Sequence, residues 1–187
     1  MKHDPADPKM EGRDRFFLAK GHAAPALYAT LAHAGYFPRE ELSTLRKLGS
    51  RLQGHPDSSL VPGVEVSTGS LGQGLSIAAG CACGLRLSGD DARVFAVLGD
   101  GECEEGQVWE AAMFAAAKKL NNLTAFIDVN GLQIDGTVEE VNNPLPLDEK
   151  FKAFGWNVVK ADGHNYAALE EAFAAAAACK GKPTVVL

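Results

Sequence analysis

The stretch that decides the fold is RVFAVLGDGECEEGQVWEAAMFAAAKKLNNLTAFIDVN, residues 93–130. Its short apolar runs at 93–98 and 124–129 predict two strands that are buried on both faces of a sheet. Residues 107–120, which lie between these runs, predict a helix. A strand, a helix and a second strand in this order indicate parallel neighbours that are joined by a right-handed crossover.

The same alternation extends on both sides of this unit. Upstream, we expect a helix that ends at Gly35, a second helix that Pro38 opens, and a buried helix of small residues, over 23–34, about 38–48 and 71–87. Downstream, the pattern predicts helix, strand, helix and strand, near 148–154, 156–160, 165–178 and 183–187. The sequence therefore predicts an α/β fold, a doubly wound and mostly parallel sheet with helices on both faces.

Size and charge narrow the possible functions. The 187 residues are enough for one domain with a sizeable core. The chain starts close to a Gly-His motif and stops inside the apolar run PTVVL, so we expect residues 1–187 to form a single domain that is incomplete at both ends. The net charge of −6 argues against a nucleic-acid partner, and no apolar run reaches the roughly 20 residues that a membrane helix requires. The four cysteines form no C-x-x-C pair, which favours reduced thiols in a cytoplasm over a zinc site.

Polar residues follow both strands of the central unit. The first strand runs into Gly99-Asp100-Gly101, and Asn130 comes directly after the second strand. The crossover brings these strand ends side by side, and the helix that follows Gly106 directs its positive end to the same place. Carboxylate and amide oxygens are ligands that suit Mg²⁺ or Ca²⁺. Gly-Asp-Gly and Asn-Gly are each common turns, but their combination at crossover spacing predicts a clamp for a metal and a diphosphate.

Residues 99–130 resemble the signature of thiamine diphosphate enzymes, in which Gly-Asp-Gly is followed one crossover later by Asn. Further motifs, in family order, make the chain similar to transketolases: Lys20-Gly21-His22-Ala23-Ala24-Pro25, Gly54-His55-Pro56, the run from Ser67 to Gly74, the run from Asp128 to Gly136, and Asp162-Gly163-His164. The resemblance implies the diphosphate-binding domain of that fold. It also implies that Asp100, Asn130 and the carbonyl of Leu132 hold the metal. The residues implied to bind the cofactor are Gly69, Leu71, Gly101, Glu102, Asn130, Ile134, His22 and His164.

Several of these residues are also compatible with purely structural roles. Ile134 is expected to pack on the cofactor rings, but it also fits a core aliphatic. By resemblance, His22 and His164 lie near the diphosphate and the reacting carbon, and His55 lies near a hydroxyl of the donor sugar. Any one of these histidines is also compatible with a structural or solvated role, which is the role we expect for His3 and His33.

Glu105 and Glu110 flank the start of a helix. Their charges either stabilise the helix N-terminus or, by resemblance, belong to an acidic network across a subunit interface, in which Glu105 has a catalytic role. The run from Gly69 to Gly74 loosely fits G-x-x-G-x-G but lacks the Lys-Ser/Thr ending of a P-loop. Ser70 stands where single-chain bacterial and yeast transketolases usually have Pro, and this departure is typical of the split-subunit branch.

The resemblance implies a transferase of carbohydrate metabolism, in the pentose phosphate pathway of the cytoplasm. It would move a two-carbon ketol unit from a ketose to an aldose with thiamine diphosphate and Mg²⁺ or Ca²⁺. The expected partners are sugar phosphates, a C-terminal subunit with the pyrimidine-binding domain, and a second copy of the chain in a heterotetramer. The alternatives are a ketol transferase for a modified sugar, a 1-deoxyxylulose-phosphate synthase, and a non-catalytic cofactor-binding module.

Overall fold

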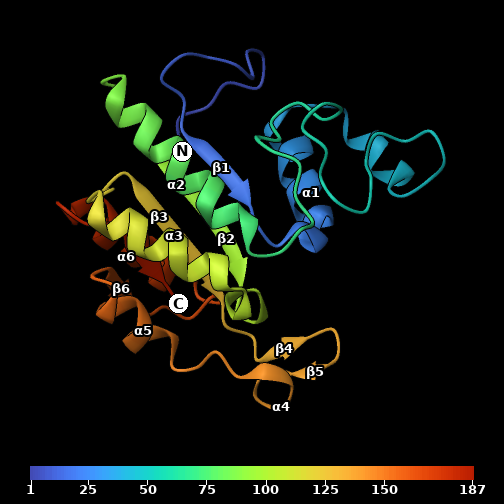
Figure 1. Ribbon diagram of the computed structural model, residues 1–187. Helices are drawn as coiled ribbons and strands as arrows, with labels where there is room; N and C mark the ends of the chain where they lie inside the picture. Colours follow the sequence, from blue (N-terminus) through green and yellow to red (C-terminus); the bar gives the residue numbers. More distant parts are fainter.

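The structure of the chain, a computed structural model, describes all of residues 1–187 (Figure 1). Five parallel strands form one sheet in the order β1-β2-β3-β7-β6. A separate antiparallel hairpin consists of β4 and β5. The strands are β1 Arg15–Leu18, β2 Val94–Gly99, β3 Leu123–Asp128, β4 Leu132–Gln133, β5 Gly136–Thr137, β6 Asn157–Val159 and β7 Thr184–Val186.

Helices cover both faces of the five-stranded sheet, which confirms the predicted fold class. They are α1 Ala24–Ala34, α2 Gln73–Leu87, α3 Gly106–Ala117, α4 Val138–Asn142, α5 Leu147–Ala153 and α6 Tyr166–Ala178. Short 3₁₀ helices occupy Gly21–Ala23, Arg39–Thr44 and Gly101–Glu104.

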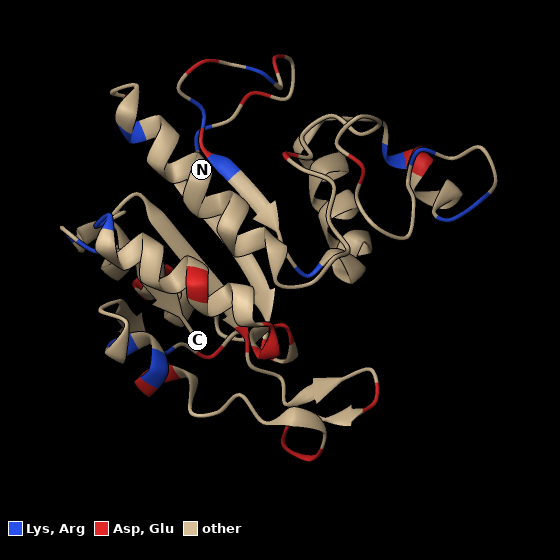
Figure 2. Ribbon diagram, in the orientation of Figure 1, with Lys and Arg blue, Asp and Glu red and all other residues tan.

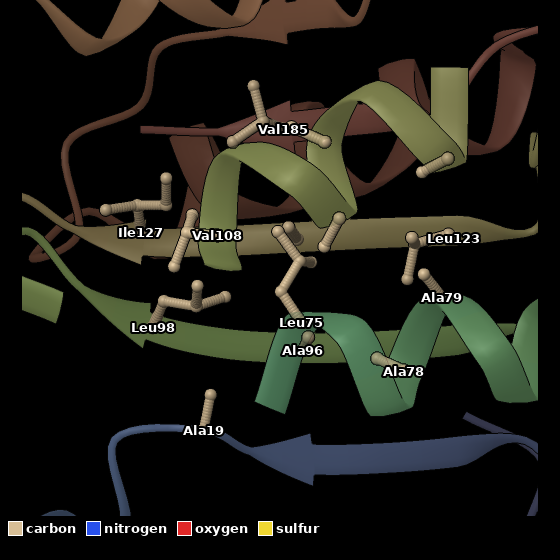
Figure 3. Close-up of a cluster of buried hydrophobic side chains, with 14 of the residues drawn as sticks. Ala19, Leu75, Ala78, Ala79, Ala96, Leu98, Val108, Leu123, Ile127 and Val185 are labelled. Atoms are coloured by element: carbon tan, nitrogen blue, oxygen red, sulfur yellow. The ribbon is translucent and has the colours of Figure 1, made fainter. Parts of the chain in front are cut away.

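Alternation along β2 shows how the two faces are used. Ala96 and Leu98 belong to the main core with α2 and α3, where Figure 3 shows them opposite Leu75 and Val108. On the other face, the ring of Phe95 meets Phe173 of α6. Successive side chains of a strand point to opposite faces, so a strand with helices on both sides is apolar throughout.

The strand order explains why α3 and α6 lie on opposite faces of the sheet. The chain steps from β1 to β2 to β3 in one direction across the sheet, and it steps back from β6 to β7. A right-handed crossover places its helix on opposite faces for these two directions, so α3 and α6 lie on opposite sides. The reversal marks the point where open parallel sheets bind ligands, outside the carboxyl ends of the strands.

Most predicted elements match the structure within a few residues, and Gly35 ends α1 in the left-handed conformation as expected. The helix predicted over 38–48 is wrong in length, because only Arg39–Thr44 is helical, as a 3₁₀ helix. The hydroxyls of Ser43 and Thr44 donate to backbone carbonyls three residues back, a local bond that competes with a regular helix.

The helix predicted over 71–87 is buried on one side only. It begins at Gln73, and it packs Leu75, Ala78 and Ala82 into the core while Ile77 and Leu87 remain exposed. None of the helices combines the length and the apolar character that crossing a bilayer requires.

Candidate active site

Three strands deliver polar residues to one edge of the sheet. β1 is followed by Lys20-Gly21-His22, β2 by Asp100, and β3 ends at Asp128, two residues before Asn130. The strands are parallel, so their carboxyl ends lie together, and Figure 2 shows acidic residues gathered where β2 ends. We call residues 99–106, which turn from β2 into α3, the acidic loop.

Asp100 is the most enclosed acidic side chain of this edge. It is only 2% exposed, and its two carboxylate oxygens accept the N–H groups of Gly101 (2.9 Å) and Gly131 (2.7 Å). None of the ion pairs in the chain includes Asp100. A buried carboxylate normally has a cation beside it, so the donor chemistry of this position fits a metal ligand.

Asn130 lies beside Asp100, because the second oxygen of Asp100 bonds the residue that follows Asn130. The amide nitrogen of Asn130 donates to Asp128 (3.1 Å), and the side-chain oxygen accepts the N–H of Leu132 (2.9 Å). The ammonium of Lys20, which is largely buried, donates to the same Asp128 oxygen at 2.7 Å. This chain of contacts fixes which end of the Asn130 amide is the oxygen.

The predicted metal ligands are mixed oxygen donors. No group of three or more His, Cys, Asp or Glu side chains lies close enough to hold a metal ion. In the predicted set, Asp100 would offer one carboxylate, and Asn130 and the backbone of Leu132 would offer neutral oxygens. Such a set leaves coordination positions for phosphate oxygens, as Mg²⁺ sites in phosphate-binding proteins commonly do.

The β4–β5 hairpin extends from this point into solvent. Ile134 is 97% exposed and Leu132 64% exposed, so the reading of Ile134 as a core aliphatic is wrong. The amide of Gln133 donates to Glu104 (2.6 Å), which ties the hairpin to the acidic loop. Apolar side chains held out over a polar edge are suited to covering the ring of a ligand.

A second loop, Gly69–Gly74, packs against the acidic loop from the other side. We call it the glycine loop. Gly72 has φ +85°, and a Cβ added there would lie 2.5 Å from the Cβ of Glu105. A Cβ on Gly21 would lie 2.6 Å from the nitrogen of Gly69, and one on Gly69 would lie 3.0 Å from the ring of His55. The backbones of Gly21 and Gly69 therefore meet directly, and the glycine loop also lies close against the side chains of His55 and Glu105, so glycine fits best at these contacts.

The three histidines of the motifs border the same edge, and all three side chains are exposed. The pKa of His22 is lowered, first by partial desolvation of its ring against the protein and then by the charges of Lys20 and His55. The charge of His164 helps Lys20 to lower the pKa of Asp128, so His164 also faces this edge. His3 and His33 instead pair with Tyr36 and Arg39.

The glutamates of the acidic loop point in different directions. Glu102 is 3% exposed, and both of its oxygens accept backbone N–H groups, whereas Glu105 is exposed at the position that precedes α3. Glu110 lies beyond the first turn of α3, so the expected pairing of its charge with the helix N-terminus is wrong. The residues that sequence reasoning missed are Lys20 and Asp128. Both stand inside quoted motifs, but only their ion pair reveals a role.

Comparison with known proteins agrees with this geometry. The family described as "Transketolase, thiamine diphosphate binding domain" matches residues 1–187. A 6-deoxy-6-sulfo-D-fructose transketolase subunit of Clostridium sp. (strain MSTE9) is 46% identical over the whole chain, which covers 68% of that subunit. One of the subunits of an apulose-4-phosphate transketolase of Phocaeicola vulgatus is 45% identical over 87% of the chain, and the match covers 58% of that protein.

Solved structures give the same result at the level of the fold. Transketolase from Campylobacter jejuni superposes on the whole chain with a TM-score of 0.95 at 33% identity, and the match covers 30% of that protein. A transketolase from Pichia stipitis in complex with xylulose-5-phosphate superposes with the same score at 35% identity. The chain thus spans between about a third and two thirds of the length of these relatives. The chain belongs to the transketolase family, and residues 1–187 correspond to its thiamine diphosphate binding domain.

Proposed function

We propose that the chain is the N-terminal subunit of a transketolase, which transfers a two-carbon ketol unit from a ketose, or its phosphate, to an aldose acceptor. The observation that carries this proposal is the buried Asp100 carboxylate, which has no cationic side chain beside it and lies next to Asn130. A divalent cation and the diphosphate of the cofactor would complete this arrangement.

The residues present fit thiamine diphosphate and Mg²⁺ (or Ca²⁺). Asp100, Asn130 and the carbonyl of Leu132 would hold the metal, and Gly101 and the acidic loop would border the diphosphate. The glycine loop, through Gly69 and Leu71, and the exposed Ile134 would line the rings. When bound, the cofactor supplies a carbanion that takes up the ketol unit and an electron sink that stabilises it.

The histidines are the groups of this chain that are suited to proton transfer. The lowered pKa of His22 keeps its imidazole neutral near pH 7, so that one ring nitrogen can accept a proton from a substrate hydroxyl. His164 would act near the diphosphate and the reacting carbon, and His55 near a hydroxyl of the donor sugar. Glu105, exposed where the glycine loop meets α3, would join an acidic network with a neighbouring subunit.

The proposed enzyme needs further polypeptide. We infer a partner subunit that carries the pyrimidine-binding domain and the sites for the phosphates of the sugars. A second copy of this chain would complete a heterotetramer, which works in the pentose phosphate pathway of the cytoplasm. Exposed apolar side chains on α2 and α3 support self-association, and the large ones are Ile77, Leu87, Met113 and Phe114.

A ketol transferase for a modified sugar is the second candidate. Two relatives that are at least 45% identical are named for 6-deoxy-6-sulfo-D-fructose and for apulose-4-phosphate. Turnover of such sugars in preference to xylulose phosphate favours this reading. Formation of 1-deoxyxylulose phosphate from pyruvate would identify a synthase instead.

Calorimetry and a ketol-transfer assay test the main proposal. The chain is titrated with thiamine diphosphate and Mg²⁺, with and without the candidate partner subunit, and the assay is run on the same samples. We expect tight binding and turnover only with the partner. Full turnover by the chain alone contradicts the split-subunit proposal, and binding without any turnover identifies a non-catalytic module.

A further inference from the structure

Glu102 is the one glutamate of the acidic loop that points into the protein. It is the second residue of the 3₁₀ helix Gly101–Glu104, and it is 3% exposed, whereas Glu105 is exposed. One oxygen accepts the N–H of Gly72 at 3.0 Å. The other accepts the N–H of Gly99 at 3.2 Å. A single carboxylate therefore joins the glycine loop to the end of β2.

Both donors depend on this carboxylate. The last hydrogen bond between the segment of β1 and the segment of β2 runs from the N–H of Lys20 to the carbonyl of Val97. Beyond it the chain turns away at Gly21, so Gly99 has no strand partner on that side. Gly72 is buried in a left-handed conformation, and Glu102 is the acceptor of its N–H. Without the carboxylate, two buried N–H groups lose their acceptors, which is an unfavourable state.

The chemistry of the group explains why a glutamate is needed. A carboxylate accepts hydrogen bonds at both oxygens, whereas the amide of glutamine offers one acceptor oxygen and an NH₂ group that only donates. Glutamine therefore satisfies Gly72 or Gly99, but not both. The residue lies two positions after Asp100, so the same short helix positions the carboxylate and the proposed metal ligand.

The resemblance implies that Glu102 binds the cofactor, but both of its oxygens are taken by backbone N–H groups. We propose instead that Glu102 is a positioning residue, which does not touch the cofactor but holds the glycine loop against the loop that carries Asp100. This inference rests on the proposed function. In that function the acidic loop borders the metal and the diphosphate, and the glycine loop lines the rings. The two hydrogen bonds of Glu102 thus set the distance between the acidic loop and the glycine loop, which form the two halves of the proposed cofactor site.

The test compares Glu102→Gln with the wild type in two measurements. Hydrogen exchange of the chain without cofactor should be at least about tenfold faster at Gly72 or Gly99, with no change at Ala125 in the centre of β3. The dissociation constant of thiamine diphosphate with saturating Mg²⁺, measured by calorimetry in the complete enzyme, should rise by about tenfold, as is typical when support of a ligand site is lost. Glu171→Gln, on the exposed side of α6, removes the same charge elsewhere and should change neither value.

Each alternative role gives a different result. Unchanged cofactor affinity in E102Q, with a wild type that binds, overturns the inference and leaves the proposed function intact. Weaker affinity with unchanged exchange at both glycines also overturns it, because Glu102 then acts by direct contact. Faster exchange throughout the sheet, Ala125 included, indicates general destabilisation and overturns it too.

Two further outcomes are covered. If E102Q does not fold, Glu102→Asp keeps both acceptor oxygens on a shorter stem and should show a smaller change confined to the same two glycines. Faster hydrogen exchange throughout the sheet in E102D would contradict the proposed role of Glu102 in joining the two loops. If the wild-type enzyme binds no thiamine diphosphate, the proposed function fails, and the exchange data on the chain alone still decide whether Glu102 couples the two loops.

Discussion

Asp100 contributes to the site through what surrounds it as much as through its own charge. Two backbone N–H groups orient its oxygens, and no cationic side chain competes for them. The amide of Asn130 is held by Asp128 and by the N–H of Leu132, so both proposed ligands are oriented before any ion arrives. Preorganised ligands lose little conformational entropy when they bind.

The first prediction concerns the charge of Asp100. Asp100→Asn keeps the size of the side chain but removes the carboxylate. We expect the affinity for thiamine diphosphate in the presence of Mg²⁺ to fall by about 100-fold, or about 2.7 kcal/mol, in calorimetry. Asp91→Asn, at an exposed position before β2, is the matched control. Equal affinity of the two variants would remove Asp100 from the metal site.

The second prediction concerns the ion pair of Lys20 and Asp128. The pKa of Asp128 in the folded protein lies below the usual 3.8, and the first cause is the hydrogen bond that its carboxylate accepts from Lys20. The stabilisation is therefore present above pH 3.8, and it is lost as the pH falls through the lowered pKa. Asp128→Asn should cost about 1 kcal/mol near pH 7, because the partly exposed pair still shields a buried ammonium.

Urea unfolding at a series of pH values checks this expectation. The difference in unfolding free energy between wild type and D128N should stay constant above the usual pKa of 3.8 and should shrink as the pH falls below it. The double variant K20M/D128N should recover part of the loss, because no ammonium is then left without its partner. A difference that stays constant down to pH 3 would show that Asp128 acts through its shape rather than its charge.

At the scale of elements, close approach between α2 and the turn after β1 fixes the start of the site. A Cβ on Gly74, in the first turn of α2, would lie 2.3 Å from the Cβ of Ala19. Gly84, in the same helix, has open space around it. Substituting each glycine with alanine therefore distinguishes the effect of close packing, at Gly74, from the effect of helix propensity, at Gly84.

The third prediction follows from this pair. Gly74→Ala should destabilise the chain by about 1–3 kcal/mol through overpacking, whereas Gly84→Ala should stabilise it by about 0.5–1 kcal/mol. Thermal or urea unfolding at equal protein concentration measures both. If G74A is also stabilising, α2 can move away from β1 and the contact does not fix the site.

Elements also show where sequence reasoning stops. The strands β2 and β3 were predictable because apolar runs on both sides of a helix leave few other arrangements. The four residues of β1, RFFL, are too short for a periodic signal, and their strand is defined by pairing with β2 almost 80 residues later. The two-residue strands of the hairpin give no signal at all.

Some features of the candidate site were also predictable from the sequence, and others were not. Asp100 and Asn130 follow strands, so their proximity was predictable from topology. The ion pair of Lys20 and Asp128, the inward direction of Glu102 and the exposure of Ile134 depend on packing between distant segments. No local pattern contains that information.

For the whole molecule, the exposed apolar side chains of α2 and α3 are where we expect a second copy of the chain to bind. Met113 and Phe114 of α3 lie in solvent, together with Ile77 and Leu87 of α2. Apolar side chains gathered on neighbouring helices commonly mark a protein interface.

The fourth prediction tests that surface. Met113→Asp should weaken self-association at least tenfold in sedimentation experiments, because a charge would be buried in the interface without a partner. The circular dichroism spectrum should not change. Ala174→Asp, on the exposed side of α6, is the control. Equal association of both variants would exclude these side chains of α2 and α3 as the contact.

The pairing of β1 with β2 also has a consequence for biosynthesis. The bond between Asp14 and Arg93 joins residues 79 positions apart, so β1 leaves the ribosome long before its partner exists. At ordinary translation rates of 5–20 residues per second, the wait is roughly 4–16 s. During this time RFFL is an apolar segment with an unpaired backbone, and a chaperone that shields nascent chains has a defined place and interval in which to act.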